Sequence, residues 1–402
     1  MAANIPLSYP PMCSVLQFMA PHKRFRLAQQ CPSLRNVEKL IPLVIDTLTL
    51  EPEHITINET IYLLGYEQIM DDKELPANSL YPTVDVISHN IDEYGFRVEN
   101  QGPRDGEIVL RDEEGMEREL SDQSDRFFRQ QQMRFDWLDD TERMQLYHHV
   151  LRKNRRPPTF KFVIKLIERN MESHQDIVEY IDCTRSLNEA REYLISKFLG
   201  NRQCPVIVKN LEVPIWSKEI KLWLPADVTF KIHGLTSGGI VKDFLNAINI
   251  DRSSPLKYVE FKYAMSQLEN LDHPVIESAL KVIISNKTLR NVQWIPFLQK
   301  LKNRSVEFRY GLSGLATAEM VQLIREWPER KWVDGISYKL EIRNRYEFHQ
   351  LQQVFDGNAK EYSLERKFFT LPLGPFHKLK ISLIDPNPHA ILTKIHIQVI
   401  RR

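Results

Sequence analysis

The chain has 402 residues, which is enough for two or three ordinary domains or for one long solenoid. Hydrophobic residues make up 42% of it, so a sizeable core is expected. The 54 lysines and arginines nearly balance the 53 aspartates and glutamates, giving a formal net charge of +1. This balance supplies no overall attraction to nucleic acid or to an anionic membrane, and we expect neither as a partner.

Residues 1–19 have no basic leading segment and are interrupted by prolines, which is a poor pattern for a secretory signal. No stretch approaches the roughly 20 apolar residues that span a bilayer. The four cysteines, Cys13, Cys31, Cys183 and Cys204, lie far apart and form no CxxC pair or zinc-ligand spacing. We therefore expect a cytoplasmic or nuclear protein with free thiols and no bound metal.

Residues 1–40 are predicted to be helical, with Pro21 and Pro32 as breaks between short helices. Two apolar patches lie within them: Val15, Leu16, Phe18 and Met19, and then Phe25, Leu27 and Ala28. Short helices of this kind cannot bury a core alone. This head must pack on the rest of the chain or on a partner.

Residues 41–98 are predicted to be a β-rich segment that packs on the body. Residues 43–50 and 54–65 alternate in polarity and are rich in β-branched side chains, with Gly65 ending the run. Residues 83–88 are predicted to form a third strand, and residues 92–98 a turn that runs into a fourth. Residues 99–158 are charged and poor in aliphatic residues, which predicts a mobile, partly disordered insertion followed by one helix at 141–156.

Residues 159–402 are predicted to form a repeat-like β/α domain. It begins with a strand at 160–168, and Ser186 and Glu189 then form a capping box for a helix that ends near Gly200. A further strand is predicted at 205–213. The last residues of the chain contain three closing strands.

The C-terminal half alternates strands with helices about every 25 to 30 residues, the period of leucine-rich-repeat-like stacking. The predicted strands are 229–235, 256–263, 305–312 and 337–343, and the predicted helices are 240–248, 274–284, 318–327 and 346–355, with an irregular unit near 294–301. Right-handed crossovers would place the four strands side by side in a parallel sheet. The predicted fold class is therefore α/β, with a helical head, a β-rich region and a leucine-rich-repeat-like stack.

Several stretches resemble a nematode-expanded group of F-box-like proteins, the F-box C proteins. These are residues 5–43, IDEYGF at 91–96, residues 190–213, VTFKIHGL at 228–235 and VQLIREW at 321–327. The body of that family is a domain of unknown function. The resemblance implies a substrate receptor of an F-box-type ubiquitin ligase, in which the head docks on a Skp-type adaptor and the body holds a target protein.

The residues that the resemblance assigns to adaptor binding are Pro11, Val15, Leu16, Phe25, Leu27 and Cys31. The sequence departs from the F-box pattern at Lys23, where an acidic residue is usual, and it lacks the opening Leu-Pro pair and the closing aromatic residue. An alternative is a non-catalytic repeat scaffold whose head packs on its own body and binds no adaptor.

An enzyme is the third hypothesis, but we expect no catalytic residue and no cofactor. No GxSxG or HExxH motif is present, and residues 234–239 lack the Gly-Lys-Ser/Thr ending of a phosphate loop. His148 and His149 are adjacent on a predicted helix and point about 100° apart, so they cannot chelate one metal together. The basic run at 152–158 fits either a nuclear import patch or cations at the end of a helix.

Overall fold

The computed structural model places most of the chain in two compact units. It describes residues 9–51, 54–70, 90–96, 98, 107–111, 151–158, 160–181, 186–213, 219–238, 242–250, 255–262, 273–285, 301, 303–309, 317–326, 335–342, 345–355, 368–373, 375–384 and 393–401. The first unit comprises residues 1–43, 48–206 and 217–228, and the second comprises residues 44–47, 207–216 and 229–402. The four domain segments predicted from the sequence differ in their bounds from these two units and remain a prediction.

The first unit begins with three short helices, α1 (Tyr9–Phe18), α2 (Pro21–Gln30) and α3 (Pro32–Leu40), as expected for the head. Pro21 and Pro32 are the first residues of α2 and α3. A proline is tolerated there because the first backbone N–H groups of a helix have no partner inside it.

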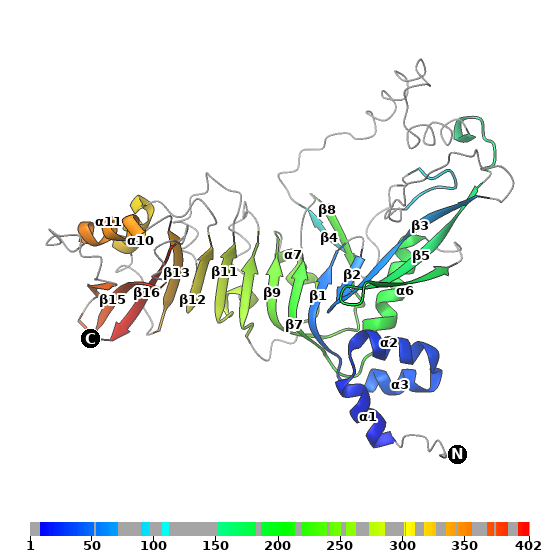
Figure 1. Ribbon diagram of the computed structural model, residues 1–402, viewed down its shortest axis with the longest axis horizontal. Coiled ribbons are helices and arrows are strands. Elements are labelled where there is room, and N and C mark those ends of the chain that lie inside the picture. The colour runs from blue at the N-terminus through cyan, green and yellow to red at the C-terminus, as the bar shows by residue number, and fades with distance from the viewer. Residues whose placement is uncertain are drawn as a thin grey trace. The chain divides into compact units, whose positions relative to one another are not determined.

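The first unit also contains an antiparallel sheet of β2 (His54–Ile57), β3 (Thr60–Met70), β5 (Phe160–Asn170) and β6 (Gln175–Ile181). Strand β1 (Val44–Leu50) pairs with β2 through Leu48–Leu50. The predicted strands at 43–50 and 54–65 are confirmed, but Gly65 does not end β3. Instead, β3 continues to Met70 and pairs with β5 along its whole length (Figure 1).

The predicted capping box at the start of α6 (Leu187–Leu199) is confirmed, and the glycine at its end is required for its small size and not for its backbone conformation. Ser186 caps α6 through its hydroxyl, and Glu189 closes the capping box on the Ser186 backbone. Gly200 is the C-cap, yet its φ of −71° needs no glycine. The need is space, because an added Cβ would lie 2.7 Å from the Ser196 carbonyl oxygen.

Part of the predicted insertion is ordered. Strand β4 (Glu107–Arg111) pairs antiparallel with β8 (Glu219–Trp223) in a separate two-stranded sheet. Most of the predicted helix at 141–156, the predicted strand at 83–88, the remaining part of the insertion at 112–142 and His148–His149 lie outside the described residues.

The second unit is built on strands that are parallel in the middle and antiparallel towards one end (Figure 1). Strands β9 (Phe230–Ser237), β10 (Tyr258–Phe261), β11 (Lys281–Ser285), β12 (Ser305–Arg309) and β13 (Ser337–Ile342) run parallel in that order. Strands β16 (Thr393–Arg401), β15 (His377–Leu383) and β14 (Phe368–Leu373) follow β13 antiparallel. Strand β7 (Val206–Val213) precedes β9 in the strand order.

The predicted fold class is wrong. A mixed β-sheet dominates the described elements, with the strand order β14-β15-β16-β13-β12-β11-β10-β9-β7-β1-β2-β3-β5-β6, in place of a head followed by a strand-helix repeat stack. The parallel pairing of the four predicted strands is confirmed, but β11 lies between β10 and β12. The predicted helix at 274–284 overlaps this strand, and the β-branched run Val282, Ile283 and Ile284 favours the strand.

The described helices of the second unit are few. They are α7 (Lys242–Ala247), α8 (Pro274–Glu277), α10 (Thr317–Glu326) and α11 (Arg345–Phe355). Between β10 and β11 the described helix, α8, is a single turn. The regular strand-helix period that predicted a leucine-rich-repeat-like stack is therefore not kept.

The two faces of the parallel strands differ in chemistry. Val259, Val306 and Leu340 are fully buried, as alternation predicts. On the other face Lys281 and Arg309 both bind Glu307. Partial burial alone would raise the pKa of Glu307, but the hydrogen bonds from these two cations lower it to about 2. The charges on this face are thus largely paired among themselves.

A close approach fixes the register between β9 and β10. Gly234 lies opposite Tyr258, and a Cβ at Gly234 would overlap the Tyr258 ring. The Tyr258 hydroxyl donates to Asn210 Oδ1 at 2.8 Å, so the ring is held over the glycine from its far end.

We predict that Gly234→Ala lowers the free energy of unfolding by about 1–3 kcal/mol, because the ring must leave its place. The effect should shrink when Tyr258→Ala is already present, which a double-mutant cycle in urea unfolding measures. Equal effects of Gly234→Ala in both backgrounds would contradict the proposed contact.

Candidate functional site

The six predicted adaptor-binding residues do not share one exposed surface. Pro11 and Val15 are exposed on α1, with 46% of Val15 accessible. Leu16 and Phe25 are buried, at 1% and 5% exposure. The remaining two, in α2 and at its end, are half-buried: Leu27 and Cys31.

Phe25 is buried by packing inside the first unit. Its ring stacks on that of Phe198 from α6, with centroids 4.5 Å apart and planes 13° apart. Tyr62 from β3 contacts the same Phe198 ring at 4.7 Å. Aromatic contacts of this geometry add stability beyond the apolar area that they bury. Helix α2 is therefore fixed to α6 and β3 by three rings.

A buried charge cluster joins the same elements. Glu38 of α3 accepts from Arg24 of α2 at 2.9 Å and from Arg202 beyond α6 at 2.7 Å. All three side chains are at most 2% exposed. Burial lowers the pKa of Arg24 and of Arg202, while Glu38 opposes the shift, and both guanidinium groups stay charged near neutral pH.

The same cations satisfy the ends of two helices. Arg24 donates to the carbonyl oxygens of Glu38, in the last turn of α3, and of Ile41 and Pro42 just beyond it, and Arg202 donates to that of Phe198. Lys39 Nζ donates to the carbonyl oxygens of Lys197 and Phe198, at 2.7 and 3.3 Å. The last carbonyls of a helix lack partners within it and carry partial negative charge, so buried cations suit them.

Helix α1 presents a different surface. Pro11, Val15 and Phe18 are spaced i, i+4 and i+7, so they lie on one side of the helix. All three are exposed, and 86% of Phe18 is accessible. Leu16 points the other way and is buried. An aligned set of exposed apolar residues beside a fixed core is typical of a docking surface.

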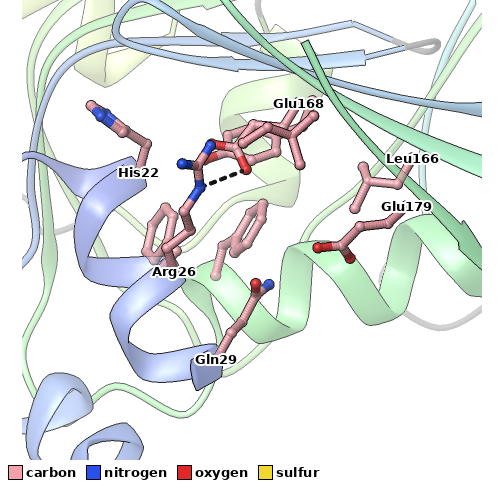
Figure 2. Close-up of a pocket in the computed structure, with 10 residues that line it drawn as sticks. His22, Arg26, Gln29, Leu166, Glu168 and Glu179 are labelled. Carbon is pink, nitrogen blue, oxygen red and sulfur yellow. Dashed lines mark hydrogen bonds and ion pairs between the residues drawn. The ribbon is translucent and has the colours of Figure 1, made fainter. Parts of the chain in front are cut away.

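A second candidate is a shallow hollow between α2 and strands β5 and β6, open to solvent and with room for about one water molecule. Figure 2 shows His22, Arg26 and Gln29 along α2 and Leu166, Glu168 and Glu179 across from them. Phe25, Tyr62 and Phe198 also line it, together with Ile177 of β6. The hollow therefore combines aromatic walls with a few charged groups.

The charges of the hollow are not balanced. Arg26 binds Glu168 through Nη2 at 2.9 Å, the ion pair drawn as a dashed line in Figure 2. Glu179 has no cation partner among the described residues. Burial lowers the pKa of His22, so its imidazole is neutral at pH 7. One carboxylate is thus left in excess.

Tyr62 adds an unsatisfied polar atom to the hollow. The residue is 3% exposed, and its hydroxyl has no hydrogen-bond partner in the described part of the chain. Burial, with Glu168 nearby, raises the pKa of Tyr62, so the hydroxyl keeps its proton. A buried hydroxyl without a partner costs free energy.

The described residues contain no group of three or more His, Cys, Asp or Glu side chains arranged to hold a metal ion. Within the same residues no helix has the length and apolar character to cross a membrane. In the basic run at 152–158, Arg152 pairs with Asp92 at 3.3 Å and lies over the Phe96 ring.

Residues 186–344 match a family model described as a domain of unknown function, DUF3557. The match begins at the N-cap of α6 and ends just beyond β13, and it covers less than half of the chain. This agrees with a domain of unknown function in the body of the chain. No curated protein and no solved structure matches.

Local sequence patterns do not indicate which residues hold the first unit together. Glu38 and Arg202 are 164 residues apart, and nothing local to either position indicates the pairing. Glu38 and Lys39 were overlooked because charged residues in a short helix are normally solvated. The one local signal is the composition of α3, a short helix in which the charged Glu38 is buried.

We predict that Lys39 makes stability depend on pH. Burial, with Arg202 nearby, lowers its pKa from 10.5 to about 8, against the opposing effects of Glu38 and Asp227. Between pH 8 and 10.5 the unfolded chain therefore holds a proton that the folded chain has lost, so stability rises with pH across this window.

Lys39→Met removes this contribution. In urea unfolding, the free energy of unfolding of the wild type should rise by about 1–2 kcal/mol relative to that of the variant between pH 8 and pH 10. Lys23→Met, on the exposed side of α2, is the matched control and should show no such trend. Parallel pH profiles for wild type and Lys39→Met would contradict the assignment.

Proposed function

We propose that the chain is a non-catalytic protein-interaction protein whose α1 docks on a Skp-type adaptor, as a substrate receptor of an F-box-type ubiquitin ligase. The observation that supports it is the exposed face of Pro11, Val15 and Phe18 on a helix whose opposite side is buried. Pro11 and Val15 are two of the positions that the F-box resemblance assigns to adaptor binding.

The packing of α2 refines this proposal. Phe25 and Leu16 hold the head together and to α6, so they act as support for the docking surface. The contact with the adaptor is then made by α1 and by the half-buried Leu27 and Cys31. The target protein is bound by another surface of the chain.

The second candidate function is a scaffold whose head binds no adaptor. It is favoured by the stack of Phe25 on Phe198 and by the buried ion pairs of Glu38, which fix the head within its own unit. A head fixed in this way needs no partner to complete its core.

The test is a pull-down of the full chain with a purified Skp-type adaptor. Phe18→Glu should weaken binding roughly tenfold or more if Phe18 is a central contact. It should leave the unfolding temperature unchanged, because the side chain is already in solvent. Met171→Glu, which changes another exposed apolar residue of the same unit, is the matched control and should bind normally.

Absence of binding by the wild-type chain would favour the scaffold. Equal binding by wild type and Phe18→Glu would show that an adaptor contacts some other surface.

A further inference from the structure

The antiparallel end of the second unit has one covered face and one accessible face. Strands β13, β16, β15 and β14 lie side by side there (Figure 1). On the covered face, Phe369 of β14 contacts Phe348 and Phe355 of α11, with ring centroids 5.9 and 6.4 Å away. Alternate side chains of the same strands point to the opposite side of the sheet. Apart from Glu341, which is 8% exposed, the described residues on that side are half-buried or exposed.

The strand register places basic side chains next to one another on this accessible face. Lys339 of β13 lies opposite His396 of β16, and His396 lies opposite Ser382 of β15. Lys380, two residues before Ser382, is diagonal to His396 and lies over the Phe368 ring at 5.0 Å from its centroid. Opposite residues have Cβ atoms about 5 Å apart and diagonal ones about 7–8 Å apart. The two lysines therefore flank the histidine.

The accessible face carries more positive than negative charge. Its four strands contribute one carboxylate, Glu341, and four lysines, Lys339, Lys378, Lys380 and Lys394. Lys394 pairs with Glu341 at 3.5 Å. The other three lysines form no ion pair with a described residue, so their charges are left in excess.

The neighbouring strand does not neutralise this excess. Glu307 of β12 lies opposite Lys339, but its carboxylate binds Lys281 and Arg309. In addition, His396 Nε2 is buried and has no hydrogen-bond partner in the described part of the chain. An anion at this place could accept hydrogen bonds from both lysines and from the imidazole.

The spread of the lysines favours a run of carboxylates over a single compact anion. Lys339 and Lys380 lie on strands separated by β16, so their backbones are about 10 Å apart. Carboxylates on alternate residues of an extended segment are about 7 Å apart and can reach both lysines. Beyond Lys339 the same face carries Glu307 and Glu260, so the basic area ends there. A long nucleic-acid strand would gain little from so short an area.

We propose that the accessible face of β13, β16 and β15 binds a short acidic segment of a partner protein, whose carboxylates accept hydrogen bonds from Lys339, Lys380 and His396. Phe368, which is 54% exposed, offers an apolar contact at the side of this area. The inference rests on the proposed interaction role and names a surface for the target protein. It is tested separately from α1.

The probe is the capped peptide Gly-Glu-Ser-Glu-Ser-Glu-Gly carrying a fluorophore, titrated with the full chain and followed by anisotropy. Lys380→Glu should weaken its binding about tenfold, because an attraction becomes a repulsion. The same variant should improve binding of the matching peptide with lysine in place of glutamate. Lys257→Glu, at an exposed position before β10, is the control of equal charge and should change the affinity little. Equal losses for both variants, or no binding by the wild type, would overturn the proposal.

His396 gives the binding a pH dependence. Burial, and then Lys339 and Lys380, lower its pKa, so the imidazole is neutral at pH 7 in the free chain. The other charged groups diagonal to it or next to it on this face, Glu341 and Lys394, pair with each other. A carboxylate bound beside His396 favours the protonated imidazole, so the peptide should bind about threefold more tightly at pH 5.5 than at pH 7.5.

His396→Gln should bind the peptide with the same affinity at both pH values. The same pH dependence in wild type and His396→Gln would place the carboxylates away from the histidine and contradict the proposed site.

A nucleic acid is the other anion that a basic face could bind, and a fluorescent oligothymidine titrated with the same variants tests it. Tighter binding of the oligonucleotide than of the acidic peptide, lost in Lys380→Glu, would overturn the proposal. Phe18→Glu should bind the acidic peptide as the wild type does, so a failed adaptor test and a failed peptide test are distinguishable.

Discussion

The first unit depends on one buried carboxylate. Glu38 lies between Arg24 and Arg202, and all three side chains are almost wholly removed from water. Burying charges is expensive unless each is paired and hydrogen-bonded. Here the guanidinium groups also bind the carbonyls at the ends of α3 and α6, while Arg24 Nε has no hydrogen-bond partner among the described residues. One anion thereby fixes α2, α3 and the end of α6 in a single arrangement.

The arrangement of α2, α3 and α6 determines which apolar residues of the first unit are exposed. Because Phe25 is stacked on Phe198, the most exposed large apolar residues of the head are Val15 and Phe18 of α1, with Leu40 at the end of α3 less exposed. The same stack forms one wall of the hollow beside β6. In the second unit, by contrast, Glu307 is paired with Lys281 and Arg309, and Glu341 with Lys394. Those charges are compensated by their neighbours within the sheet.

Sequence patterns predicted the features that depend only on residues close together in the chain. The capping box of Ser186 and Glu189, the prolines that begin α2 and α3, and the alternation of buried residues along β12 and β13 were all readable from the sequence. Lys281–Ser285 was mistaken for helix because a short apolar run has no clear period. The mixed sheet was missed because strand pairing depends on segments far apart in the chain.

The candidate site was harder to predict for the same reason. The resemblance identified Pro11 and Val15, which are exposed, but it could not show that Leu16 and Phe25 are buried. The hollow joins α2 to β5 and β6, more than 130 residues later. The unsatisfied Tyr62 hydroxyl can be recognised only from the structure, in which no described residue forms a hydrogen bond with it.

The central claim is that α2 and α3 are an integral part of the first unit. Native-state hydrogen exchange measures this directly, because it gives the opening free energy of individual amides. We expect the protected amides of α2 and α3 to open with the same free energy as those of α6 and β3. Exchange of α2 and α3 at much lower free energy, with α6 and β3 still protected, would show a separable head and contradict the role assigned to Glu38.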